Sequence, residues 1–459
     1  MAMESYEEAT ALIVIINQVL MLRNFADPRK NKCKYICSWV CIVSFVTLFF
    51  MCLLIGEIFF LQMVTLNIQI LLYVFTMAVI TYGYLIIVSV NLYNSKAALR
   101  LTAQINNVDE ALKKLGAKIE YRNLFHRVIV TVSFWTLLSI ATVLGTQISL
   151  QQQLHGVQLA VNFCYVYIMY TGSIVLFEFY IIVHWLGLKF EQTNELLATF
   201  LLEDGQSNAE NRNAKITVQP APNFCDKVQL CGGLSKNVHV LEQIRLVHLR
   251  LCSVSKMLNR MFQRQILIFV FMTLNYMLVA FYNMYLKIKK WDQFSVSLNG
   301  LLLFFIDATY NFIKLVLVSY NCERTTNRAN KAIDMIHACP LYDVDPDLKD
   351  EIVQFCLQMS YMQPGKSKSA SLWLNYCFIH QCAAYVLTNL ILMIQWSDDM
   401  IKQDWVTVKN ETEYAVVKTQ CRGNSEMRKR VLASFNYANQ PILQSDIDHS
   451  RRQERVING

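Results

Sequence analysis

The sequence predicts an all-α polytopic membrane protein with seven transmembrane helices, an N-terminus in the cytoplasm and a C-terminus outside the cell. Three observations lead to this fold class. Hydrophobic residues make up 54% of the 459 residues and charged residues only 17%, which is more apolar than a soluble protein of this length. Seven apolar stretches are long enough to cross a bilayer. Basic residues gather in alternate connections between these stretches.

The first apolar segment, at residues 9–22, is too short to span a membrane and follows Glu4, Glu7 and Glu8. It lacks the basic start of a signal peptide, so we expect a helix that lies on the membrane surface or docks on the bundle. Seven longer stretches follow, and each is expected to span the bilayer: 35–61, 68–90, 128–150, 159–185, 266–286, 296–320 and 372–396.

Basic residues determine the expected orientation. The N-terminus and the segments 91–127, 187–265 and 321–371 contain 5, 7, 10 and 6 Lys plus Arg, whereas the connections 62–67 and 151–158 contain none. Positive charge favours the cytoplasmic side, so the N-terminus is expected inside. Asn410 begins an N-glycosylation sequon, which agrees with an extracellular C-terminus.

The chain is expected to form one membrane domain with cytoplasmic elaborations. We predict a cytoplasmic N-terminal segment at 1–34, a seven-helix domain at 35–396 and a polar extracellular tail at 397–459 to which no role is assigned. Two helical extensions, at about 187–265 and 321–371, are expected to form an inner bundle around a flexible insert. The amphipathic segment 345–359, followed by Pro364-Gly365, is interpreted as a coupling element or as a plain cytoplasmic helix.

The last apolar stretch carries no formal charge, yet polar residues recur along it at helical spacing. Gln381, Tyr385, Thr388, Leu392 and Gln395 follow one another at spacings of four, three, four and three, which places them on one stripe of a helix. Within a bilayer such a stripe has to face protein or water. Two interpretations follow: contacts between helices of a bundle, or the lining of a pore.

Other classes of protein are disfavoured. The basic residues are spread over the loops, so nucleic acid is rejected as a partner. None of the fourteen Cys has zinc spacing, and no phosphate loop, HExxH or GxSxG occurs, so neither metal, cofactor nor enzyme activity is expected. A G-protein-coupled receptor would have its N-terminus outside, and a transporter would favour internal repeats. Both remain the alternative functions.

The final span also carries a resemblance. Thr388-Asn389, five apolar residues, Gln395 and Trp396 resemble the signature that ends insect gustatory receptors, in which Tyr normally stands where this chain has Asn389. Leu374-Asn375 is similar to the pair that opens the same helix in that family. The resemblance covers about residues 1–396, and the family normally ends soon after this helix.

The resemblance implies a ligand-gated, non-selective cation channel that is opened by a small organic tastant. It further implies a homo- or hetero-tetramer with other gustatory receptors, in contact with membrane lipid, in the plasma membrane of sensory neurons. Sugar receptors of the family usually carry an acidic residue where Leu390 and Ile391 stand, which favours a bitter-type tastant. The implied pore residues are Tyr385, Thr388, Leu392 as the gate, and Gln395.

A ligand pocket is then expected in the outer half of the first six spans, where aromatic walls and a few amides suit an organic molecule. Taken individually, each tyrosine at a span end is more typical of an interfacial belt or of packing than of a ligand contact. The predicted pocket residues are Asn162, Tyr165, Tyr170, Tyr276, Asn283 and Asp307. The remaining charges within the spans, Glu178 and Lys314, are interpreted as structural pairing.

Overall fold

The computed structural model describes residues 5–23, 32–62, 68–150, 156–210, 234–289, 298–338, 346–362 and 374–396. All regular secondary structure in these ranges is helical, and no strand occurs among them. By its internal contacts the chain divides into Met1–Thr388 and Asn389–Gly459, and each unit is described by itself. The all-α prediction is thereby confirmed. The Asn410 sequon, Pro364-Gly365 and the predicted tail at 397–459 lie outside the described residues.

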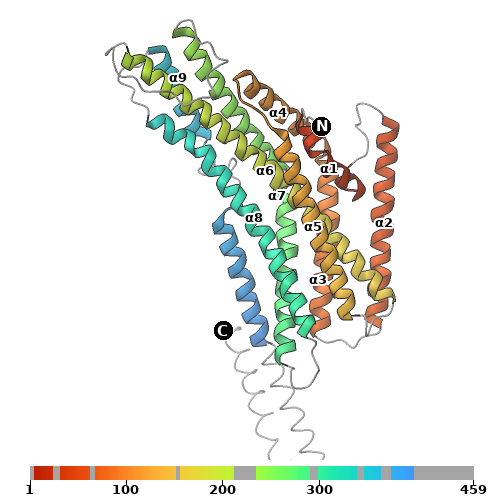
Figure 1. The fold of residues 1–459 in the computed structure, drawn as a ribbon. Helices are drawn as coiled ribbons and strands as arrows, with labels where there is room; N and C mark the ends of the chain where they lie inside the picture. The colour runs from red at the N-terminus through yellow and green to blue at the C-terminus, as the bar shows by residue number, and fades with distance from the viewer. Residues whose placement is uncertain are drawn as a thin grey trace, which may run out of the picture. The chain divides into compact units, whose positions relative to one another are not determined.

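The helices follow the expected order along the chain (Figure 1). They are α1 (Tyr6–Val19), α2 (Lys32–Gln62), α3 (Ile68–Tyr93), α4 (Ser95–Lys114), α5 (Tyr121–Leu150), α6 (Gly156–Glu210), α7 (Leu234–Lys289), α8 (Leu298–His337) and α9 (Pro346–Met362). A final helix, Tyr376–Trp396, begins in the first unit and ends in the second.

Six of these helices are long and apolar enough to cross a membrane within the described residues: α2, α3, α5, α6, α7 and the final helix. The expected span at 296–320 lies in α8, whose described residues do not contain so apolar a window. All seven predicted stretches nevertheless fall in long helices, because about 20 apolar residues favour helix in a bilayer.

The short N-terminal helix docks on the bundle, which was one of the two expected placements. The Ser5 side chain accepts a hydrogen bond from the backbone N–H of Glu8 at 3.3 Å, and Glu7 and Glu8 lie in the first turn. Tyr6, Ala9, Ile13 and Asn17 recur at spacings of three and four and are buried. The sequence therefore forms a capped helix with one face packed against the bundle.

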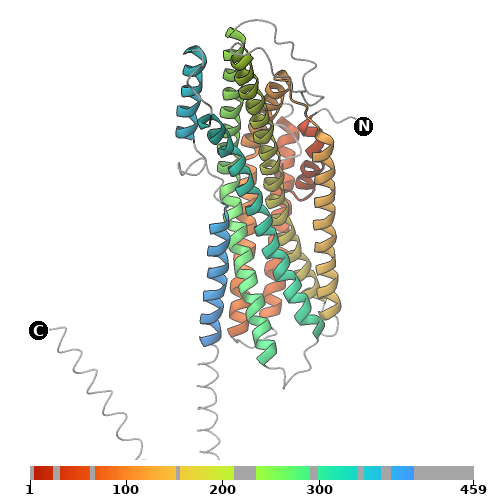
Figure 2. The same cartoon turned by 60° about the vertical axis from the view of Figure 1, so that its left-hand side comes forward.

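Three long helices form the centre of the first unit. Figures 1 and 2 show α6, α7 and α8 running side by side, and their contacts with one another agree. Both α6 and α7 continue well beyond a bilayer's thickness. The first residues of the insert that was expected to be flexible are helical, since α6 continues to Glu210. The rest of the insert, in residues 211–233, lies outside the described part.

The inner extensions have a core of their own. The predicted amphipathic segment 345–359 forms α9, which packs against α7 and α8 (Figure 1). Its apolar positions Leu348, Ile352, Phe355 and Met359 are all buried. The helix therefore joins the ends of two spanning helices instead of lying free in solvent, as an inner bundle requires.

Glycine permits two close approaches to α7. A Cβ atom added at Gly172 of α6 would lie 2.4 Å from a ring carbon of Phe269, and one added at Gly83 of α3 would lie 2.3 Å from the Met272 sulfur. A buried aromatic ring moves only with its surroundings, whereas a methionine sulfur is on a flexible side chain. The α6–α7 contact at Gly172 is therefore less tolerant of an added methyl group than the α3–α7 contact at Gly83.

We predict that Gly172→Ala destabilises the protein more than Gly83→Ala does. Overpacking at Phe269 is expected to lower the free energy of unfolding by about 1 to 3 kcal/mol, while Met272 accommodates the added methyl group by changing rotamer. Thermal unfolding of the two purified variants in the same detergent measures the difference. Equal melting temperatures would contradict the asymmetry.

Candidate functional site

The predicted pore residues lie on an exposed face of the final helix. Tyr385 is 39% exposed and Leu392 is 56% exposed, and the side chains of Thr388 and Gln395 are exposed as well. Within the first unit, a different face of the same helix packs on the bundle through Cys382 and Val386. Only 11% of the apolar window of this helix is buried, against 67% in α6 and in α7.

Exposure of polar groups on a spanning helix has a physical consequence. Amide and hydroxyl groups that face lipid lose their hydrogen bonds to water, at an expense of about 1 to 3 kcal/mol each. Such a face is stable in a bilayer only when further protein or water covers it. A single chain leaves this face open, so the stripe is suited to an assembly in which several final helices surround water.

A polar and aromatic cluster joins three spanning helices in the first unit. We call it the Lys314 cluster; it comprises Trp135, Thr136 and Ser139 of α5, Tyr170 and Ser173 of α6, and Tyr310, Asn311 and Lys314 of α8.

The Lys314 ammonium group is enclosed within this cluster. Its Nζ atom donates to Ser173 Oγ at 2.9 Å and to Asn311 Oδ1 at 3.0 Å. The same atom lies 3.8 Å from the centre of the Tyr310 ring and 5.4 Å from that of Trp135. Ring faces attract cations, so the two aromatic rings and the two oxygen acceptors together stabilise a charge that is 4% exposed.

The structure places the predicted ligand residues unevenly. Tyr170 belongs to the Lys314 cluster, where its hydroxyl lies 2.9 Å from Thr136 Oγ1. Tyr165 is buried in the core, while Tyr276 and Asn283 are partly buried on α7. The side chains of Asn162 and Asp307 lie outside the described part of the structure.

Sequence reasoning placed Glu178 and Lys314 in structural pairs, and the structure identifies their partners. Glu178 accepts a hydrogen bond from Asn17 Nδ2 at 2.8 Å and lies 4.0 Å from Arg23 Nη1. These partners come from α1 and the turn after it, and their spacing in the chain gave no signal of the contact. Met21, at φ 56°, redirects the chain in that turn and brings Arg23 toward α6.

Charged side chains also connect the inner helices. Arg245 of α7 forms an ion pair through Nε with Glu351 of α9 and donates from Nη1 to Gln358 Oε1 at 3.2 Å. Arg328 of α8 forms an ion pair with Glu191 of α6 at 2.6 Å. These contacts fix α9 and the end of α8 to the two longest helices, so a displacement of one inner helix is transmitted to the others.

This all-helical architecture, in which long apolar helices continue into a second packed bundle and a final helix exposes a polar stripe, is that of a polytopic membrane protein. The model of the 7tm chemosensory receptor family matches residues 10–400. The chain belongs to this family. The predicted resemblance to insect chemosensory receptors is confirmed, and the family is one of receptors and not of enzymes.

A solved structure with the same fold is the insect olfactory receptor OR5 from Machilis hrabei. The TM-score is 0.56 and the sequences are 11% identical, with 85% of this chain and 98% of that chain covered. At this identity the similarity shows the fold alone. No curated protein sequence gives a significant match.

We predict that Arg245→Met loosens the inner bundle. The substitution keeps the apolar stem but removes hydrogen bonds to the partly buried Glu351 and Gln358, which is expected to destabilise the protein by about 1 to 3 kcal/mol. The control is Arg250→Met, because Arg250 lies on the same helix and is exposed. Hydrogen exchange of α9 in the purified protein measures the effect; protection equal to that of the control would contradict it.

Proposed function

We propose that the protein is a taste receptor that acts as a ligand-gated, non-selective cation channel in the plasma membrane of sensory neurons. The supporting observation is the exposed polar stripe at Tyr385, Thr388, Leu392 and Gln395 on a helix that contains no Asp, Glu, Lys or Arg. In a homo- or hetero-tetramer with other gustatory receptors, four such stripes would surround one aqueous path. The N-terminus is proposed to lie in the cytoplasm, which follows from the distribution of basic residues.

The composition of the stripe also bears on ion selection. Its side chains are hydroxyls, an amide and one leucine, and none is charged. Rings of carboxylates select cations strongly, so a pore of this composition would discriminate weakly among small cations. The Leu392 side chains of the four subunits would form one apolar ring around the pore. A narrow ring would exclude water and close the pore, and a wide ring would let water and ions pass.

Ligand binding is proposed near the outer half of the first six spans, with the Lys314 cluster as the element that senses it. The cluster contacts α5, α6 and α8 at once, and Tyr170 is both a member and a predicted pocket residue. A bitter-type organic tastant would open the channel only if it bound the open state more tightly than the closed state. Asn162, Tyr165, Tyr276, Asn283 and Asp307 are retained as proposed pocket residues.

Whole-cell recording in a heterologous cell that expresses the chain tests this function. A panel of bitter-type tastants is applied with a blocker of G-protein signalling present. Rapid cation current that survives the blocker is the expected result, because a channel needs no second messenger. Current that the blocker abolishes would favour a G-protein-coupled receptor instead.

We predict that Leu392→Ala raises the current measured without tastant and that Gln395→Ala changes relative permeability among cations. The first substitution widens and wets the proposed apolar ring, and the second removes an amide from the ion path. Leu387→Ala is the matched control, since Leu387 is 60% exposed but lies on another side of the helix. Surface expression is measured for all three variants. If Leu392→Ala had the basal current of the control and Gln395→Ala had its relative permeability, the assignment of these residues to the pore would be contradicted.

A second prediction concerns the Lys314 cluster. Lys314→Met keeps an unbranched side chain that is one atom shorter, but it removes the hydrogen bonds to Ser173 and Asn311 and the charge over the Tyr310 ring. We expect the tastant concentration for half-maximal current to shift about tenfold, as the loss of one charge-assisted hydrogen bond implies. The control is Lys331→Met, an exposed lysine on the same helix. An unchanged dose response with intact expression would contradict a sensing role.

A further inference from the structure

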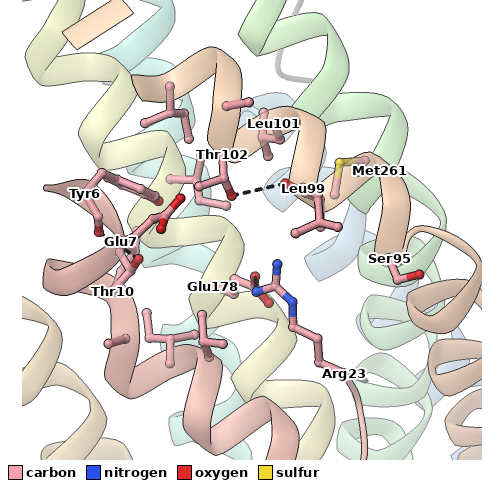
Figure 3. A pocket seen from close by; sticks show the side chains of 18 of the residues that line it. Tyr6, Glu7, Thr10, Arg23, Ser95, Leu99, Leu101, Thr102, Glu178 and Met261 are labelled. Carbon is pink, nitrogen blue, oxygen red and sulfur yellow. Dashed lines mark hydrogen bonds and ion pairs between the residues drawn. The ribbon is translucent and has the colours of Figure 1, made fainter. Parts of the chain in front are cut away.

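A cavity of about 530 Å³ opens where α1, α4, α6 and α7 meet. Figure 3 shows side chains from the N-terminal helix and from α4 on its walls, with Arg23 and Glu178 close to each other between them. None of the residues predicted to line the pore or the tastant pocket lines it. The cavity thus has no part in the function proposed above.

The position of the cavity along the helices places it at one surface of the bilayer. The apolar span of α3 ends at Tyr93, and α4 begins two residues later with Ser95, which lines the cavity. The Asn94 side chain donates to the Met261 carbonyl at 2.9 Å, and Met261 is a lining residue of α7. Two helices therefore change from apolar span to polar extension beside this cavity, which is the level of the lipid headgroups.

The cavity holds charges of both signs. Arg23 and Lys96 provide positive charge, and Glu7 and Glu178 provide negative charge. The pair Arg23–Glu178 is held loosely, with 4.0 Å between Nη1 and Oε1, and both side chains remain about one-fifth exposed. A ligand that carried an anionic and a cationic group could satisfy both kinds of charge at once.

Part of the rim of the cavity is apolar, and this part is called the apolar rim. Ile15 of α1 is 54% exposed and Leu99 of α4 is 43% exposed, and both line the cavity. Val19, one turn beyond Ile15, extends this apolar surface along α1 with 68% exposure. Exposed aliphatic side chains at a membrane surface favour contact with acyl chains. The cavity therefore offers charged and exposed apolar side chains side by side, a combination that matches an amphiphile.

We propose that this cavity binds the zwitterionic headgroup of a phospholipid. The phosphodiester would lie between Arg23 and Lys96, and the ammonium group would lie at Glu7, whose carboxylate already accepts a hydrogen bond from Asn106 Nδ2 at 3.4 Å. The acyl chains would leave over the apolar rim. Because Glu7 belongs to α1 and Lys96 to α4, the bound lipid holds the N-terminal helix against the bundle.

The shared chemistry, a phosphate ester that carries an ammonium group, also occurs in soluble molecules such as glycerophosphoethanolamine. The apolar rim distinguishes the two sources, because a soluble headgroup gains nothing from Ile15 and Leu99. A lipid is therefore expected to bind more tightly than its own headgroup.

Native mass spectrometry of the full chain tests this site. The purified protein is exchanged into mixed micelles that contain equal amounts of phosphatidylethanolamine, phosphatidylcholine, phosphatidylglycerol and phosphatidylserine. The unmodified protein is expected to retain a zwitterionic lipid. Lys96→Ala should reduce bound phospholipid about tenfold, and Glu7→Gln should shift the preference toward phosphatidylglycerol, because the partner of the ammonium group is lost.

The control variants are Glu110→Gln and Lys114→Ala. In the unmodified protein these two residues form an exposed ion pair of 3.1 Å on α4, outside this cavity, so both substitutions are expected to leave lipid retention unchanged. Glu7 and Lys96 are themselves exposed, so their substitution is not expected to disturb folding. Retention that is the same in all four variants would overturn the proposal. Displacement of the lipid by an equal concentration of glycerophosphoethanolamine would also overturn it and would assign the site to a soluble ligand.

Discussion

Polar groups within a bilayer need hydrogen-bond partners, and this structure depends on that constraint. Backbone groups meet it through helix formation, which accounts for an architecture built entirely of helices over the described residues. Side chains meet it through contacts such as those of Lys314, whose ammonium group has oxygen acceptors and ring faces around it. The stripe on the final helix differs, because the described chain leaves its side chains exposed. An assembly around water would cover this face.

The long helices contribute to two separate regions of the structure, one within the membrane and one beyond it. In the membrane, α5, α6 and α8 contact each other through the Lys314 cluster, where a ligand could change the balance between two arrangements. With their C-terminal parts, the same α6 and α8 continue into a second core that includes α9. Continuous helices connect these regions, and the ion pairs Arg245–Glu351 and Arg328–Glu191 link the helices to one another. Movement near a ligand can therefore reach the inner bundle without passing through a loose loop.

Sequence predicted the helices well because length and apolarity act locally. The stretch from Leu372 to Trp396 carries no formal charge, and the amphipathic segment that forms α9 repeats apolar residues at helical spacing, so each could be recognised without any partner. The contacts of the candidate sites depend on tertiary structure instead. Lys314 and Ser173 are 141 residues apart, and Asn17 and Glu178 are 161 apart. A charge within a span predicts that a partner exists, but only the packing of α1 on α6 shows which one it is.

Intersubunit disulfide formation along the final helix tests the pore assignment most directly. Thr388→Cys, Leu392→Cys and Gln395→Cys are compared with Leu387→Cys and with the unmodified chain after mild oxidation in membranes. If the final helices surround one axis, the three stripe positions form disulfide-linked dimers, and Leu387→Cys gives no more than the unmodified chain. Dimers at Leu387→Cys and none at the stripe would place the polar face away from the axis and contradict the channel account.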